Sequence, residues 1–327
     1  MDFRNLIRQP LPVATLTFLL IVVAAFVRAV SIPYFSGTAP ARCAPFGEYT
    51  LLIRESAPVA ALVASLFMLI WAGLLIGRNT VRAELYAQRC FLAMPLFGIA
   101  SCAIVLSSDF LTQSLVLLLL TMASRNFYNS FHRHYCFDRI FRGALCIGLI
   151  PLLYAPGIGL WLLIPIVIRL FRRTLRESIV AIAGLLLPLF FAGFIYWAVE
   201  DDFTAPYHRI TEALSAPCGS LFFGENTLPI LTAWGLILFL LFCAAALLLF
   251  NVYQLRTKPR NILLYNLCLF CITVGIYFFP GSTAITPALA APAIATLLPV
   301  VLTRINGIAA SIFYLVILLL SLLPGLI

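Results

Sequence analysis

Charge is scarce in this chain of 327 residues. Asp, Glu, Lys and Arg make up only 10% of it, and hydrophobic residues account for 63%. Such a composition excludes an ordinary soluble globular protein and predicts a chain embedded in lipid. Ionisable residues are also nearly absent from the interiors of the apolar runs. That absence argues against a proton-driven pump or ion transporter with charged groups at mid-membrane, while a lipid flippase stays open.

The chain also lacks a recognisable soluble domain, a low-complexity tract and an internal repeat. We therefore expect a single transmembrane domain over residues 1–327. Arg4 and Arg8 precede an apolar stretch, as in a signal peptide, but the stretch 11–32 is long and has no Ala-x-Ala cleavage site. The sequence predicts a retained first helix there.

Long apolar runs are what the chain does contain, and about 20 apolar residues are enough to cross a bilayer. The sequence therefore predicts an all-α, polytopic helical bundle. The expected spans are 11–32, 57–76, 90–108, 109–124, 140–154, 156–170, 178–198, 229–253, 262–279, 283–303 and 306–326.

The distribution of charge orients these eleven spans. If successive connections alternate between the two sides, 17 of the 21 Lys and Arg residues fall on one side and eight of the 12 carboxylates on the other. Because basic loops stay cytoplasmic, this sorting predicts a multi-pass protein with its N-terminus inside and its C-terminus outside. The net charge of +9 then belongs to orientation and membrane-lipid contact, and we expect no nucleic-acid partner.

The pair of short segments 140–154 and 156–170 is predicted to be a helical hairpin. Tyr154-Ala155-Pro156-Gly157 lies between them, and Pro with Gly marks a turn. Both flanks are basic, so a hairpin returns the chain to the cytoplasm, whereas one kinked helix would separate the two basic flanks across the membrane.

Two outer connections are long enough to form a site, and we expect them to form a small outer cap. They cover residues 33–56 and 199–228 and carry seven of the eight outer carboxylates. Each also contains one cysteine, Cys43 in the first and Cys218 in the second. If the exterior is oxidising, these two cysteines could form a disulfide between the loops.

This layout resembles the GT-C membrane glycosyltransferase superfamily. The N-terminus is inside, and long loops follow the first and seventh spans. The Gly-bearing hairpin RGALCIGLIPLLYAPG and the later Gly-x-x-x-Pro helix, Gly184 to Pro188, are similar to elements of that superfamily. The whole chain also resembles an uncharacterised bacterial family of small multi-spanning membrane proteins, which implies a location in a bacterial inner (cytoplasmic) membrane.

The resemblance implies a polyprenyl-phosphate-linked sugar donor, an outward cavity and a carboxylate base on the first external loop. Gly47-Glu48-Tyr49 matches the acidic-residue-plus-Tyr pattern, so Glu48 is the expected catalytic base. The loop has no Asp and its acid comes late, so a non-catalytic relative is the alternative. Glu48 could instead stabilise the N-terminus of a short helix over Tyr49 to Arg54.

Four basic residues are candidates for holding the lipid phosphate, because cationic side chains bind phosphate oxygens. They are Arg28, Arg54, His208 and Arg209. The alternative is that they contact headgroups at the interface or snorkel. We also expect Glu55 to pair with Arg54, and Asp109 to cap the helix of the fourth span.

Glu200, Asp201 and Asp202 are three consecutive carboxylates just outside the seventh span. They could bind a divalent cation, which takes oxygen ligands. Adjacent acids point in different directions, however, so an orientation signal or a helix cap is the alternative.

Two further functions stay open on the sequence. The protein could be a non-enzymatic membrane subunit that binds a membrane-protein partner through its outer loops, or a transporter of a lipid or small molecule.

Overall fold

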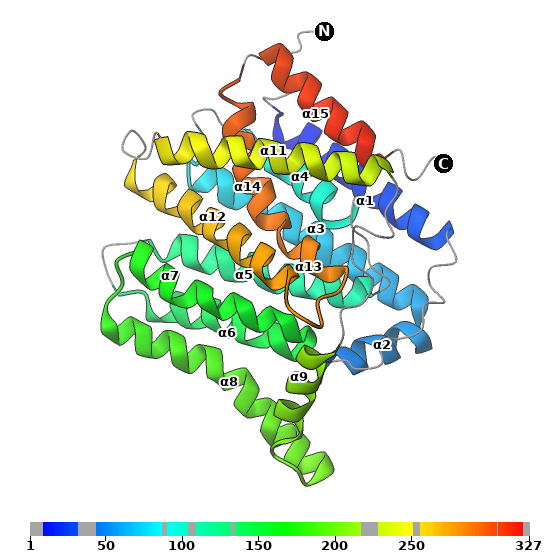
Figure 1. Ribbon diagram of the computed structural model, residues 1–327, viewed down its shortest axis with the longest axis vertical. Helices are drawn as coiled ribbons and strands as arrows, with labels where there is room; N and C mark the ends of the chain where they lie inside the picture. Colours follow the sequence, from blue (N-terminus) through cyan, green and yellow to red (C-terminus); the bar gives the residue numbers. More distant parts are fainter. Residues whose placement is uncertain are drawn as a thin grey trace.

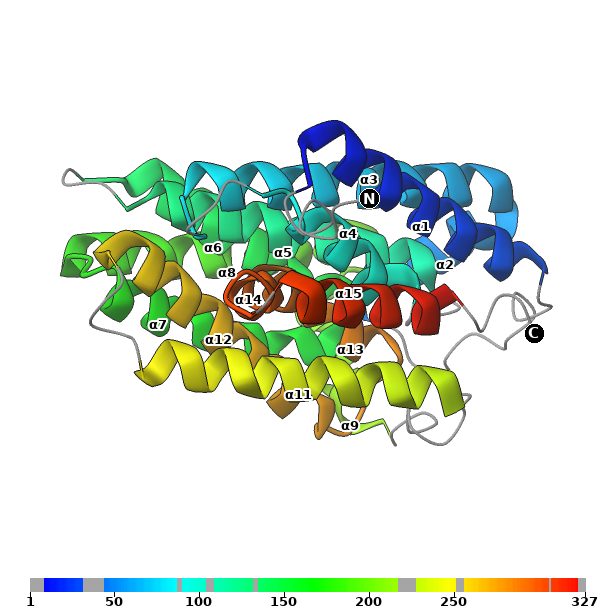
Figure 2. The same ribbon diagram turned by 90° about the horizontal axis from the view of Figure 1, so that it is seen from above.

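The computed structural model describes residues 9–31, 44–86, 90–103, 109–131, 135–216, 228–250, 256–305 and 307–322. In these ranges the chain is entirely helical and has no strand, as the apolar runs predict (Figure 1). α5 and α11 run across the longest axis of the molecule, which is vertical in Figure 1. Seen from above, α3 and α11 lie on opposite sides of the bundle (Figure 2).

The first half of the chain forms α1 (Leu11–Ser31), α2 (Gly47–Ser56), α3 (Pro58–Arg82), α4 (Ala93–Gly98), the π-helix η3 (Ile99–Ala103), α5 (Phe110–Asn129), α6 (Phe137–Leu153), the 3-10 helix η4 (Ala155–Leu162) and α7 (Leu163–Leu170). The second half forms α8 (Leu175–Glu200), α9 (Ala205–Ser215), α11 (Leu228–Phe250), α12 (Thr257–Tyr277), α13 (Ile285–Leu289), α14 (Ala291–Leu302) and α15 (Gly307–Leu322).

Five helices are long and apolar enough to cross a membrane: α3, α5, α8, α11 and α12. Shorter apolar helices lie within 11–27, 93–102, 155–170, 291–302 and 307–321. About 20 apolar residues match the thickness of the hydrocarbon core. The five long helices therefore point to a multi-pass membrane protein.

Three predicted spans are not continuous α-helices. The predicted span 90–108 begins as α4 and continues as the π-helix η3, and 156–170 begins as a 3-10 helix before α7. The span 283–303 is divided between α13 and α14 at Ala290. Pro292 lies in the first turn of α14, where its missing N–H costs nothing, so proline favours a new helix start at this point.

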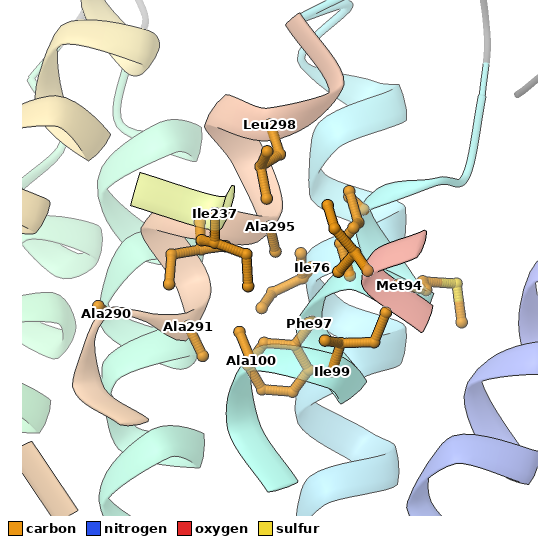
Figure 3. Close-up of a cluster of buried hydrophobic side chains, with 14 of the residues drawn as sticks. Ile76, Met94, Phe97, Ile99, Ala100, Ile237, Ala290, Ala291, Ala295 and Leu298 are labelled. Atoms are coloured by element: carbon orange, nitrogen blue, oxygen red, sulfur yellow. The ribbon is translucent and has the colours of Figure 1, made fainter. Parts of the chain in front are cut away.

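The short helices form the centre of the molecule. Every residue of α4 and of α14 is buried. Figure 3 shows their side chains meeting those of α3 and α11, with Met94 and Phe97 near Ile76, and Ala295 and Leu298 near Ile237. Figure 2 shows α14 near the middle of the bundle, viewed almost along its axis. The interior here is a packed apolar core.

Two glycines let α6 and α8 approach closely. A Cβ added at Gly148 on α6 would lie 2.3 Å from the carbonyl oxygen of Leu185, and one at Gly184 on α8 would lie 2.8 Å from that of Phe141. Both obstacles are backbone atoms, which cannot rotate away. Small residues permit such contacts between membrane helices, so these two positions bring the α6 and α8 backbones together.

The predicted helical hairpin is confirmed. α6 ends at Leu153, Tyr154 makes the turn in an extended conformation, and η4 with α7 returns the chain. The rings of Phe131, before α6, and Phe171, after α7, lie 5.8 Å apart, so both flanks of the hairpin reach the same end of the bundle. We call this the basic end, because Arg139, Arg169 and their basic neighbours cluster there.

A buried carboxylate joins the connections at the basic end. Glu177, in the first turn of α8, accepts hydrogen bonds from the backbone N–H groups of Cys136 (2.9 Å) and Thr174 (3.0 Å) and pairs with Arg173 at 3.3 Å. Thr174 and Glu177 form a capping box, which satisfies free N–H groups at the start of α8. We call Glu177 and these partners the Glu177 hub. It fixes the start of α8 against the chain that enters α6.

Candidate functional site

The first and second long connections meet through Arg209, on α9. Its guanidinium donates to Glu48 Oε2 at 2.8 Å and to the two carboxylate oxygens of Glu200 at 3.0 and 3.3 Å. Glu48 lies in the first turn of α2, and Glu200 is the last residue of α8. Figure 1 shows α9 beside the C-terminal part of α8. Three of the predicted site residues, from two distant parts of the sequence, are therefore in direct contact.

Tyr196 lies beneath this cluster. The Arg209 guanidinium carbon is 5.0 Å from the centre of the Tyr196 ring, a cation–π arrangement, and Nη1 lies 3.4 Å from its hydroxyl. The hydroxyl of Tyr196 donates to the carbonyl of Pro45, 3.1 Å away, which holds the chain just before α2. We call Arg209, Glu48, Glu200 and Tyr196 the Arg209 clasp. Tyr196 forms its buried floor, and the three charged side chains form its open side.

The clasp keeps its arginine charged. Partial burial alone would lower the pKa of Arg209. The neighbouring Tyr196 and the carboxylates of Glu48 and Glu200 outweigh burial and raise that pKa. The side chains of Arg209 and Glu48 remain 32% and 49% exposed, so a ligand from the outside can reach both.

Arg54 is placed differently from the prediction. It is buried on the inward face of α2 and donates to Asp109 at 3.0 Å, in place of the expected pairing with Glu55. The expected cap is also wrong, because the Asp109 side chain makes no capping hydrogen bond at the start of α5. This ion pair attaches α2 to α5, and its burial removes Arg54 from the surface that a lipid phosphate would approach.

A second contact supports the same docking. The hydroxyls of Thr50 on α2 and Thr112 on α5 lie 2.6 Å apart, and both residues are buried. The backbone N–H of Phe46 also donates to the carbonyl of Leu152 at the end of α6, at 2.8 Å. α2 is therefore fixed on one face by α5 and α6, and it presents Glu48 and Tyr49 on the other.

The three consecutive carboxylates have three different environments. Glu200 binds Arg209, and Asp201 ends α8 in the left-handed conformation, with a φ of 56°. Asp202 accepts hydrogen bonds from the hydroxyl (2.7 Å) and the backbone N–H (2.8 Å) of Thr204. These bonds, the hydroxyl's first, lower the pKa of Asp202. The three carboxylates therefore have different partners, because α8 ends at Glu200 and the chain turns at Asp201.

These different environments count against the predicted divalent-cation site. Within the described ranges, no group of three or more His, Cys, Asp and Glu side chains is arranged to hold a metal ion. Asp202 is not the expected helix cap either, because the N-cap of α9 is Thr204; its hydrogen bonds to Thr204 shape the turn into α9.

The remaining predicted residues lie apart from the clasp or outside the described part. His208 is exposed on α9, next to Arg209 in sequence. Arg28 belongs to α1, but its side chain is not among those described. Cys43 and Cys218 lie outside the described residues, so their disulfide stays a prediction.

An apolar groove lies beside the C-terminal end of α2. Its lining comes from the first turns of α3, and Glu48 does not contribute to it. The lining residues are Ala57, Pro58, Val59, Ala60, Val63, Ala64 and Phe67. This apolar lining, on a helix long and apolar enough to span a membrane, suits contact with lipid better than contact with a polar ligand.

Comparison of the chain with family models, curated proteins and solved structures finds no match. The function must therefore be argued from the clasp itself.

Two contacts of the predicted site residues could not be foreseen from the sequence pattern. One is between Tyr196 and Arg209, and the other is the ion pair of Asp109 with Arg54. Tyr196 lies inside an apolar run, where an aromatic residue reads as packing. Its position one turn from the acidic residues at the end of α8 was the available signal, because Tyr is enriched at membrane interfaces.

Proposed function

We propose that the chain crosses the membrane eleven times with its N-terminus inside, and that it resides in a bacterial cytoplasmic membrane. Support comes from the helices, because each of the eleven predicted segments coincides with a helix or a pair of consecutive helical segments. In this proposed orientation the Arg209 clasp lies outside and the basic end lies inside.

Accessibility mapping tests this arrangement. We expect a cysteine introduced at Lys258, just inside α12, to be protected from an impermeant thiol reagent in intact cells, and one at His208 to react. Native protein is the control for labelling of the existing cysteines. Labelling of both positions from the same side would contradict the arrangement.

We further propose that the outer clasp binds the phosphate of a lipid-linked donor and transfers its sugar, as the GT-C resemblance implies. The observation that carries this proposal is the 2.8 Å contact between Glu48 and Arg209. It places a carboxylate and a cation, the base and the phosphate ligand that such a transfer needs, within one open cluster.

Binding of the donor phosphate would release Glu48 from Arg209. A phosphate competes with carboxylates for the guanidinium, because Arg binds both through the same paired donors. Arg209 would then exchange Glu48 for the donor phosphate, leaving the Glu48 carboxylate free to accept the acceptor's hydroxyl proton. The acceptor oxygen forms a bond to the sugar's anomeric carbon, the bond from that carbon to the phosphate oxygen breaks, and Arg209 holds the departing polyprenyl phosphate.

Binding of polyprenyl phosphate to the purified full chain tests the role of Arg209. We expect Arg209→Gln to weaken binding about 10- to 100-fold, the usual effect of losing a hydrogen-bonded charge. Arg142→Gln is the matched control, because Arg142 is also an exposed arginine paired with a carboxylate, but at the basic end. Equal binding by native protein and the Arg209 variant would contradict the proposal.

A non-enzymatic subunit is the second candidate, and one observation favours it. α2 exposes the apolar side chains of Tyr49, Leu52 and Ile53 beside the clasp. In this alternative the clasp is a structural connection that presents α2 to a membrane-protein partner. The two candidates differ in whether the Glu48 carboxylate itself is required.

A further inference from the structure

At the basic end, the turn between α7 and α8 has more positive charge than its carboxylates neutralise. Arg169, Arg172 and Arg176 are exposed there. The ion pairs found among the described residues near the turn use other arginines: Arg173 with the buried Glu177, and Arg142 with Asp138. Three cations in this turn are therefore left to solvent or to a ligand.

The turn is held in one conformation. Arg172 has a left-handed backbone with a φ of 50°, and the N–H of Arg173 donates to the carbonyl of Ile168 at 2.9 Å. The Glu177 hub then fixes the start of α8 immediately afterwards. A fixed backbone presents the exposed arginines with less loss of conformational entropy on binding.

An apolar stripe begins beside these arginines and follows α8 into the bilayer. Leu175 is 84% exposed and Ile179 is 69% exposed, and Ile182 and Leu186 continue the same stripe at helical spacing. The described helices that pack most closely on α8 (α6, α7 and α9) leave these four residues exposed. The stacked rings of Tyr135 and Phe137, 5.4 Å apart and also exposed, lie at the level expected for interfacial aromatic residues.

We propose that the α7–α8 turn is a binding site for an anionic phospholipid of the cytoplasmic leaflet. Arg172 and Arg176 bind the headgroup phosphate, and the acyl chains lie along the stripe that starts at Leu175. Charge complementarity selects an anionic lipid, because the turn offers unneutralised guanidinium groups and the stripe offers only apolar contacts. This site is at the opposite end of the molecule from the Arg209 clasp and does not depend on sugar transfer.

Lipid retention by the purified full chain tests the proposal. Native mass spectrometry would compare bound phosphatidylglycerol with bound phosphatidylcholine after exposure to equal amounts of each. We expect native protein to retain phosphatidylglycerol preferentially and R172Q/R176Q to bind it about 30-fold more weakly, since each arginine near a charged lipid surface contributes about fivefold. Millimolar inorganic phosphate should not displace the lipid, because the acyl chains contribute to binding.

R78Q/R82Q is the matched control. Arg78 and Arg82 are exposed at the end of α3, so this variant removes the same charge away from α8. The single variant R176Q leaves the left-handed position untouched, and we expect it to lose about fivefold if the double variant does not fold. Equal retention of the two lipids by native protein, or equal losses in R172Q/R176Q and R78Q/R82Q, would overturn the proposal, because either result indicates only a general attraction of basic residues to the membrane.

Discussion

Replacing Glu48 with Gln is expected to slow sugar transfer by about a hundredfold or more, the usual contribution of a positioned general base. Glutamine preserves the shape of the side chain and can still accept a hydrogen bond from Arg209, but it cannot take the acceptor's proton. The residue is half-exposed, so the stability of the fold should change little. Single-turnover transfer from a polyprenyl-linked donor, together with a melting curve, measures both quantities.

Glu55→Gln provides the matched control for Glu48→Gln. Glu55 is also an exposed carboxylate on α2, but it does not belong to the clasp, so its variant should retain native activity. If Glu48→Gln keeps full function while Leu52→Ser on the exposed apolar face abolishes it, the enzyme proposal is wrong. That result would favour the membrane-subunit candidate.

Removing the carboxylate of Glu177 is expected to destabilise the protein by about 3–5 kcal/mol, the usual effect of breaking a buried ion pair. Glu177→Ala leaves the Arg173 guanidinium, whose side chain is 5% exposed, without its carboxylate, and removes the acceptor for the N–H groups of Cys136 and Thr174. Denaturant or thermal unfolding in micelles measures the change. Asp138→Ala is the control, since the exposed Asp138–Arg142 pair should contribute less than about 1 kcal/mol.

The Glu177 hub also gives a direction for the effect of pH. Burial alone would raise the pKa of Glu177, but hydrogen bonds from Cys136 and Thr174 and the charge of Arg173 outweigh it and lower that pKa below the ordinary value of 4.5. Its stabilising contribution is therefore present above pH 4.5 and is lost as the pH falls toward the folded-state value. Glu177→Ala should show a smaller loss of stability than native protein over this acidic range, and an equal loss in both would contradict the assignment.

The helices were predictable because lipid imposes the same requirement on every crossing, a long run of apolar residues. Of the breaks within them, the division at Ala290 had a partial signal in Pro292, whereas the π-helix at Ile99–Ala103 had none, because it is set by how the short helices fit the core. Because successive connections alternate between the two sides of the membrane, the sequence predicts that Glu48 and Arg209 lie on the same side. Their direct contact across 161 positions depends on tertiary packing, which the sequence pattern does not reveal. Thr174 and Glu177 had a readable signal, because Thr-x-x-Glu is the sequence pattern of a capping box.

The complete burial of α14 has a consequence for how the protein is assembled during synthesis. Its 12 residues span about 18 Å at the rise of an α-helix, less than the roughly 30 Å of hydrocarbon. α14 is therefore too short to cross the bilayer as an isolated helix. α4, α11 and α12, against which α14 packs most extensively, are all made before it, and of its main neighbours only α15 follows. A receptive site can therefore exist when α14 leaves the ribosome, and the order of the helices along the chain matches the order in which the bundle can close.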